Sequence, residues 1–383
     1  MQLTLPEALA LADTHLTAGR AAEAKGLYAR ILDAAPGDPT APRRLGVILA
    51  GEGDAAAAAE LLGRAVRNEP NDAAAHRDLA AALDACGRAA EARASRQRAH
   101  WLLDAAKGLP GDDAPACRLC GGATRFRMFR TVRGRHVTGY FLCGACGSLQ
   151  TEAPHWLEEA YAHTTVGPDY GICRRTLQLV IECFGLFTLL QLDGRRTFVD
   201  FGGGNGLFTR MMRDRGFNML SYDKYQAPFY SDVYVVPDYA AAKPDVVTAF
   251  EVFEHLPNPG ADIDALMAGR PDLVVFTTDT FDGQGPDWGY LAPETGQHVF
   301  FYGRAAFAWI AERYGMEFCD LGLLKVLASQ RLVEERQAAG VSFDAVCARA
   351  ADRAAFVPYA TGLFANEQMR WQQAWVSTMT PPP

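Results

Sequence analysis

Apolar and small residues recur every 34 positions through the first third of the chain. Each unit carries a leucine, a glycine, an alanine and, in two units, a proline at matching places: Leu11, Leu45 and Leu79; Gly19, Gly53 and Gly87; Ala24, Ala58 and Ala92; Pro36 and Pro70. The glycine ends one helix, the small alanine lets the next helix pack closely, and the proline stops helix propagation. The pattern predicts three helix–turn–helix units within residues 5–103.

From residue 197 the pattern changes to short apolar runs that alternate with helical segments. Strands are expected at 197–201, 219–222, 245–250 and 273–277, with a shorter one at 233–238. Strands separated by helices indicate a doubly wound parallel sheet. After about residue 321 the pattern is helical again, over 327–339 and 343–355. The predicted fold class is α/β, with a Rossmann-like doubly wound core that follows an all-α array.

A glycine-rich turn follows the first predicted strand. Residues 197–206 read T-F-V-D-F-G-G-G-N-G, and Asp223 ends the next strand. Glycines allow unusual backbone dihedrals and close approach of a ligand, and the helix N-terminus beyond them offers free N–H groups. An acid at the end of the second strand can accept hydrogen bonds from ribose hydroxyls. The segment therefore predicts a nucleoside-cofactor site.

The spacing of this turn differs from the dinucleotide fingerprint G-x-G-x-x-G, because Leu207 stands where the last glycine would fall. Asp200, just before the turn, would repel a pyrophosphate but suits an ammonium or sulfonium charge. The segment resembles the first motif of class I S-adenosylmethionine (SAM) methyltransferases, D-x-G-x-G-x-G. The resemblance implies a cofactor site made of Asp200 near the methionine part, Asp223 on the ribose, Asp238 near the adenine, and Gly202, Gly204 and Gly206 in the turn.

The 34-residue helix–turn–helix unit of the first third resembles the tetratricopeptide repeat (TPR). Three such units form a shallow concave face that can bind a partner protein or peptide, or support self-association. The alternative is a scaffold that packs only on its neighbours.

Four cysteines form two C-x-x-C pairs, Cys117 with Cys120 and Cys143 with Cys146, separated by 22 residues. A glycine follows each pair, where it permits the tight turn of a metal knuckle. Four thiolates leave no open coordination position, so the spacing predicts a structural zinc ion in a small zinc ribbon, with an iron–sulfur cluster as the alternative. Residues 124–142 between the pairs have the alternating character of a β-hairpin.

Acidic and imidazole side chains follow two further strands. Glu251, Glu254 and His255 come after the strand at 245–250, and His298 closes the loop that follows the strand at 273–277. In a helical turn, positions 251, 254 and 255 share one face. These four residues could bind a divalent cation, or His298 or His255 could act as a metal-free general base.

This second constellation resembles the metal-dependent O-methyltransferases that modify RNA 3′ ends and ubiquinone precursors. In those enzymes a Glu-x-x-Glu-His turn, with a further His in the RNA enzymes, holds Mg²⁺ or a similar ion against vicinal hydroxyls. The resemblance implies Mg²⁺ or Mn²⁺ as candidate ions for this chain. In the same loop, Trp288 and Tyr290 could stack on a sugar ring.

Composition and charge limit the classes of binding partner and the cellular location that we expect. The chain of 383 residues has a net charge of −8, which argues against a nucleic-acid face, where Lys and Arg would cluster. No signal peptide and no apolar run of bilayer-spanning length is evident. We therefore expect a cytoplasmic protein without a membrane span.

Residues 117–320 also resemble bacterial methyltransferases of the type 11 and 23 kind, in which a cysteine zinc module precedes a class I core. Some of these act on nucleotide-linked deoxysugars, and others accompany glycosyltransferases of surface-polysaccharide clusters. The expected domains are a TPR array at 1–108, a zinc ribbon at 115–150, a methyltransferase domain at 151–325 and a helical extension at 326–383.

The predicted function is O-methylation by SAM of a small hydroxylated acceptor such as a sugar or glycan. The alternatives are C-methylation of a nucleotide-linked sugar, or a TPR scaffold with a non-catalytic SAM-binding fold.

Overall fold

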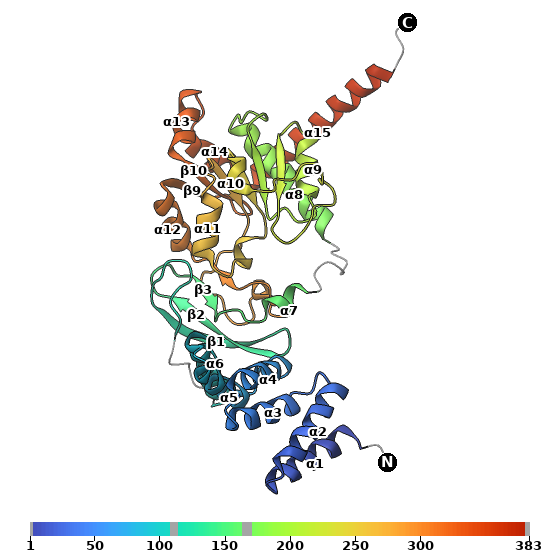
Figure 1. Ribbon diagram of the computed structural model, residues 1–383. Coiled ribbons are helices and arrows are strands. Elements are labelled where there is room, and N and C mark those ends of the chain that lie inside the picture. The colour runs from blue at the N-terminus through green and yellow to red at the C-terminus, as the bar shows by residue number, and fades with distance from the viewer. Residues whose placement is uncertain (1–2, 108–113, 163–170, 380–383) are drawn as a thin grey trace. The chain divides into compact units, whose positions relative to one another are not determined.

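The computed structural model describes residues 3–107, 114–162 and 171–379 (Figure 1). The chain forms two compact units. One comprises Met1–Pro115, Arg125–Phe141 and Pro293–Gly296, and the other comprises Ala116–Thr124, Leu142–Ala292 and Gln297–Pro383. The division into four domains expected from the sequence stays a prediction, because packing alone does not show which parts fold independently.

Six helices in three antiparallel pairs begin the first unit. They are α1 (Leu5–Thr17), α2 (Ala21–Ala34), α3 (Thr40–Gly51), α4 (Ala55–Asn68), α5 (Ala73–Ala85) and α6 (Ala89–Lys107). Each repeated glycine separates the two helices of a pair, in the left-handed region at φ 75° (Gly19), 89° (Gly53) and 76° (Gly87). The three repeated alanines are fully buried. The predicted all-α array is confirmed.

A β-hairpin belongs to the same unit as the helices. Its strands β1 (Thr124–Val132) and β2 (His136–Cys143) are hydrogen-bonded neighbours, as expected from the alternating pattern. The Asn71 side chain donates to the carbonyl of Arg135 and accepts from the N–H of Val137 at 2.9 Å. The Trp101 and Phe141 rings lie 5.2 Å apart. The hairpin therefore packs against the helices around α5 and α6.

The second unit is built on a six-stranded sheet in the order β5-β4-β6-β7-β10-β9. The strands are β4 (Phe198–Phe201), β5 (Met219–Tyr222), β6 (Val246–Ala249), β7 (Leu273–Phe276), β9 (Met316–Asp320) and β10 (Lys325–Ser329). The first four are parallel, and β10 runs antiparallel to both of its neighbours. The predicted doubly wound core is confirmed.

Two sequence expectations need correction. Residues 327–329, expected to begin a helix, end strand β10, and helix α13 starts only at Gln330 because the Ser329 hydroxyl caps it by accepting from the Leu332 N–H. The strand expected at 233–238 is reduced to one isolated bridge between Ser221 and Val235. Both errors concern short segments, which form a strand only where a neighbouring strand pairs with them.

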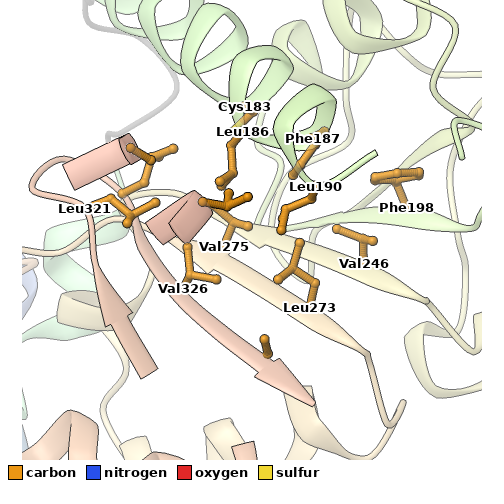
Figure 2. Close-up of a cluster of buried hydrophobic side chains, with 14 of the residues drawn as sticks. Cys183, Leu186, Phe187, Leu190, Phe198, Val246, Leu273, Val275, Leu321 and Val326 are labelled. Atoms are coloured by element: carbon orange, nitrogen blue, oxygen red, sulfur yellow. The ribbon is translucent and has the colours of Figure 1, made fainter. Parts of the chain in front are cut away.

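Helices cover both faces of this sheet, because successive residues of the strands point to opposite sides. Leu273 and Val275 of β7 face one cluster, and Val274 and Phe276 face the other. The first cluster includes α8 (Ile172–Leu189), α9 (Leu207–Arg213), α13 (Gln330–Ala338), α14 (Phe343–Ala351) and α15 (Arg353–Met379). Figure 2 shows Leu186 and Phe187 of α8, with Leu190 directly after it, over β4, β6 and β7.

The second face is covered by α10 (Tyr239–Ala242), α11 (Pro259–Met267) and α12 (Arg304–Tyr314). Shorter elements complete the unit: β3 (Leu149–Thr151), which pairs antiparallel with β8 (Phe300–Phe301), helix α7 (Leu157–Tyr161), and the 3₁₀ turns η1 (Phe253–His255) and η2 (Gly289–Leu291). Among the described residues no helix is long and apolar enough to cross a membrane.

The C-terminal helix α15 is fixed to α8 by a buried ion pair and by close packing. The Arg353 guanidinium donates two hydrogen bonds of 2.6 Å to the fully buried Glu182 carboxylate. A Cβ added to Gly185 would lie 2.6 Å from the Cβ of Ala360. Helix α8 thus approaches α15 more closely than any side chain at position 185 would allow.

We predict that Gly185→Ala destabilises the protein relative to Gly362→Ala, by about 1–3 kcal/mol in the free energy of unfolding. Both positions lie in helices, so both variants share the gain in helix propensity of about 1 kcal/mol. Only position 185 adds a steric clash, since nothing lies within 4 Å of a Cβ at Gly362. Urea unfolding of the two variants measures the difference, and equal midpoints would contradict the packing described.

Candidate functional site

Three glycines of the turn after β4 adopt backbone angles that favour glycine. Their φ values are 73° (Gly202), 53° (Gly204) and 78° (Gly206). A Cβ would lie 2.6 Å from Val252 Cγ2 at Gly202 and 2.1 Å from Ser231 Oγ at Gly206. At Gly204 the nearest atom would be 3.8 Å away. Gly202 and Gly206 are thus fixed by packing as well as by dihedral angle, whereas Gly204 borders open space.

Asp223, directly after β5, lies against this turn. Its Oδ2 accepts the N–H of Gly204 at 3.0 Å, and its Oδ1 accepts the N–H groups of Tyr225 at 2.8 Å and Gln226 at 2.9 Å. The structure therefore brings together the glycine turn and the acid that the sequence assigned to a ribose.

Asp200 is buried beneath the turn. Its Oδ1 accepts the Thr248 hydroxyl of β6 at 2.7 Å, and its Oδ2 lies 3.5 Å from the Thr209 hydroxyl of α9. Burial raises the pKa of Asp200 to about 7, and the hydrogen bonds from Thr248 and Thr209 partly oppose that rise. The carboxyl group joins three elements in the interior, an orientation that favours support of the turn over direct contact with a methionine part.

Asp238 caps helix α10. Its Oδ1 accepts the N–H groups of Ala240 at 3.0 Å and Ala241 at 3.3 Å. The neighbouring Tyr239 is buried and donates its hydroxyl to the Leu266 carbonyl at 2.7 Å. The carboxylate therefore caps its own helix. The assignment of Asp238 to adenine stays a prediction.

Glu254, His255 and His298 lie together. One ligand atom from each residue falls within 4.8 Å of the others. The two imidazole rings meet edge to face, with centroids 4.9 Å apart. The N–H of Val299 donates to the Glu254 carbonyl at 2.9 Å and so joins the turn η1 to the segment of His298. Two segments separated by more than forty residues thus form one site.

The Glu254 side chain is fully buried, and within the described part of the chain neither carboxylate oxygen has a partner at good hydrogen-bond geometry, although the hydroxyls of Tyr290 and Thr278 lie near enough to oppose the rise of its pKa. Burial, and secondarily the charge of Glu251, raise the pKa of Glu254 to about 8. The carboxyl group therefore keeps its proton at neutral pH unless a cation replaces it.

Both imidazoles are held by specific partners. His298 Nδ1 lies 2.6 Å from the Tyr290 carbonyl, which can only accept, so Nδ1 carries a proton. His255 Nδ1 lies 3.1 Å from the Tyr161 hydroxyl. Burial, with the neighbouring His298 as the second cause, lowers the pKa of His255 to about 3, so this ring is neutral.

Glu251 is not part of this group. The expected helical turn begins only at Phe253, so residues 251 and 254 do not share a face. Glu251 has φ 53°, its N–H donates to the Thr277 hydroxyl at 2.9 Å, and its Oε1 accepts that hydroxyl at 2.8 Å. The residue thus connects the ends of β6 and β7.

The aromatic residues of the loop pack on one another. The Trp288 ring lies 5.3 Å from Tyr290 and 5.8 Å from Phe301, and the Tyr290 hydroxyl lies 3.2 Å from Thr278 Oγ1. Tyr161, which sequence reasoning missed, stacks on Tyr225 at 6.3 Å in addition to its contact with His255. Nothing in the sequence around α7 distinguishes this tyrosine from an ordinary helix residue.

The four cysteines of the two C-x-x-C pairs converge in the second unit. The sulfur atoms of Cys117 and Cys146 are 3.7 Å apart, and those of Cys120 and Cys143 are 3.6 Å apart. Thiolates at a zinc–sulfur distance of about 2.3 Å in a tetrahedron are separated by about 3.8 Å, so the cluster fits zinc. The glycine after each pair is left-handed, at φ 72° and 70°.

Residues 174–320 match the sequence model of a family described as a methyltransferase domain. This range contains the glycine turn, Asp223 and the group of Glu254, His255 and His298. The match supports a SAM-dependent methyltransferase. No curated protein sequence matches the chain.

Solved structures show partial similarity. MamA of AMB-1 is 26% identical over 26% of this chain and 55% of its own, with a TM-score of 0.25, so the chain spans about half the length of that protein. Magnesium protoporphyrin IX methyltransferase from Synechocystis PCC 6803 with bound SAH is 13% identical over 45% of this chain and 90% of its own, with a TM-score of 0.33. The SAM-bound form of that enzyme is 12% identical over 46% and 95%, also with a TM-score of 0.33.

We predict that Glu254→Gln stabilises the protein without added divalent ions at pH 8 but hardly at pH 5. In wild type the folded-state pKa of about 8 lies above the unfolded value, so stability falls as pH rises between the two. The neutral amide avoids this loss, which amounts to a few kcal/mol. Thermal melts at both pH values measure it, with the exposed Glu312→Gln as control. An equal shift at pH 5 and pH 8 would show that Glu254 is not buried as a neutral acid.

Proposed function

We propose that the chain is a SAM-dependent methyltransferase that modifies a hydroxyl oxygen of a small acceptor such as a sugar or glycan. The observation that carries this proposal is the shared location of two groups at the carboxyl ends of parallel strands. The glycine turn and Asp223 follow β4 and β5, and Glu254, His255 and Thr278 follow β6 and β7. Ligands of open α/β sheets bind at this edge, where the chain order reverses.

The glycine turn and Asp223 would hold the cofactor. Asp223 already accepts three N–H groups, and its carboxylate would also accept the ribose hydroxyls. Gly204 leaves open space where the nucleoside would approach. Asp200 would act through the turn by joining β4, β6 and α9, rather than by touching the methionine part.

The acceptor would be held and activated beside Glu254, His255 and His298. A divalent ion such as Mg²⁺ or Mn²⁺ bound there would lower the pKa of an acceptor hydroxyl and orient it. The residues fit such an ion in three respects. The carboxyl oxygens of Glu254 have no partner at good hydrogen-bond geometry among the described residues, His255 is neutral, and His298 donates Nδ1–H to a carbonyl, as metal-binding histidines usually do. Two imidazoles and one carboxylate are a common ligand set for first-row transition ions, so these residues favour Mn²⁺ over Mg²⁺.

Without an ion, His298 is the better candidate for a general base. A base works best when its pKa lies near the working pH, and the pKa of His255 is far below that range. His298 Nε2 would accept the proton, since Nδ1 donates to the Tyr290 carbonyl. The methyl transfer itself requires in-line alignment of acceptor and sulfonium, which the two halves of the site would supply from one edge.

The helices α1–α6 support a second, separate assignment. We propose that this array contacts a partner protein or a second copy of the chain, because stacked helix pairs present an extended surface. The cytoplasmic location expected from the sequence stays a prediction.

The central test is methyl transfer from labelled SAM to a panel of glycans and nucleotide-linked sugars. Transfer to a hydroxyl oxygen, identified by NMR of the product, supports the proposal. Transfer to carbon would instead support the C-methylation alternative. Binding of SAM without transfer to any acceptor would support the scaffold alternative.

We predict that Gly204→Val lowers SAM affinity by about 100-fold or more. A branched side chain is strained at φ 53° and would project into the open space beside the turn. Isothermal titration calorimetry measures the affinity, and Gly362→Ala, far along α15, is the control. Unchanged affinity in Gly204→Val would place the cofactor elsewhere.

We predict that His298→Ala loses turnover by about 10²-fold or more while SAM affinity stays within about twofold. The side chain would serve the acceptor or its ion rather than the cofactor. His15→Ala in α1 is the control for removal of a histidine. Titration with Mg²⁺ or Mn²⁺ separates the two roles, since a metal ligand makes wild-type activity depend on the ion. Full activity of His298→Ala would disprove either role.

A further inference from the structure

Arg118, inside the first cysteine pair, connects the metal knuckle to both segments that carry the histidines. Its Nη1 donates to the Pro257 carbonyl at 3.0 Å, and its Nη2 donates to the Val299 carbonyl at 2.7 Å. Pro257 lies two residues after His255, and Val299 directly follows His298. One guanidinium group thus spans the two chain segments whose side chains form the candidate acceptor site.

Further contacts fix this arginine and the knuckle in place. The Arg118 N–H donates to Gln150 Oε1 at 2.8 Å, and its carbonyl accepts the N–H of Gly260 at 3.2 Å. A Cβ at Gly260 would lie 3.0 Å from the Arg118 carbonyl oxygen, so the knuckle rests directly on the start of α11. The guanidinium Nε is buried.

The second cysteine pair holds the other end of the same segment. Ser148 accepts the N–H of Gly303 at 3.2 Å and lies 3.3 Å from the sulfur of Cys146. Cys117, Cys143 and Cys146 share one buried cluster with Phe253 and Phe300, which flank the site. Both knuckles therefore support the segment from His298 to Gly303.

We propose that Arg118 is a positioning residue through which the four-cysteine metal centre sets the separation of His255 and His298. The catalytic part of this proposal rests on the proposed function. The zinc ion would hold the Cys117–Cys120 turn, the turn would hold Arg118, and Arg118 would hold the carbonyls of Pro257 and Val299. Loss of the ion would release both carbonyls together and so disorder the acceptor side, while the glycine turn and Asp223 would keep their structure.

The first test needs no activity. Hydrogen exchange is followed by mass spectrometry in peptides that cover residues 251–262, 297–303 and 200–208 of the full-length protein. In Arg118→Met, exchange rises about tenfold or more in the first two peptides and is unchanged in the third, with about one zinc retained per chain. The control Arg353→Met removes another arginine that joins two segments, and there the first two peptides stay protected.

Removal of zinc with a chelator completes this test. In wild type it raises exchange in the same two peptides, whereas in Arg118→Met it adds little, because the connection is already broken. Such non-additivity is expected only if the ion and the arginine act along one path. Unchanged exchange of the two peptides in Arg118→Met, or fully additive effects, would overturn the proposal.

The second test uses turnover. Arg118→Met lowers kcat about tenfold or more with the KM for SAM unchanged within about twofold, and Arg118→Lys recovers part of the loss because an ammonium can still donate to one carbonyl. Arg118→Lys also serves if the methionine variant does not fold. Loss of SAM affinity in step with kcat would show a general structural role and overturn the proposal. Absence of methyl transfer by wild type would refute the proposed function, and the exchange data would still decide the role of Arg118.

Discussion

The parallel pairing of β4 with β5 and β6, and of β6 with β7, is the constraint on which the site depends. Parallel strands leave the sheet at one edge, so four segments that are distant in sequence emerge side by side. The glycine turn, Asp223, the turn η1 and Thr277 all lie in these four segments. Side chains from separate loops can therefore converge at this edge of the sheet.

A buried carboxyl group without partners at good hydrogen-bond geometry is costly, and Glu254 shows how the fold tolerates it. Burial raises the pKa of the group and so favours its neutral form. Such an arrangement lowers the stability of the folded protein at high pH. By comparison, Asp200 is also buried but accepts hydrogen bonds from two hydroxyl groups, which join β4 to β6 and α9.

Local signals made much of the fold predictable from sequence. The 34-residue period and the glycine turn depend on backbone angles and close packing that only particular residues permit, so they can be read directly. The four cysteines could also be recognised from the sequence, because a tetrahedral metal ion requires cysteines in closely spaced pairs. The strands β9 and β10 were missed because the pairing of β10 with β7 and of β9 with β10 is decided by tertiary contacts.

Candidate site residues were less predictable, for the same physical reason. The sequence around a carboxylate such as Asp238 is the same whether the group caps a helix or binds a ligand. Tyr161 and Arg118 contact groups about ninety and more residues away, and nothing in their own surroundings marks them. Glu251 was grouped with Glu254 on the assumption of an α-helical turn, but the 3₁₀ turn begins after it.

The β1–β2 hairpin limits where the protein could be truncated. The chain passes between its two compact units five times, and the hairpin belongs with the helices although the cysteines at its base belong with the sheet. A shortened gene that starts after residue 115 would still encode the hairpin but would strip Trp101 from Phe141. Removal of the repeat helices would thus expose the Phe141 ring, which is fully buried in the intact chain.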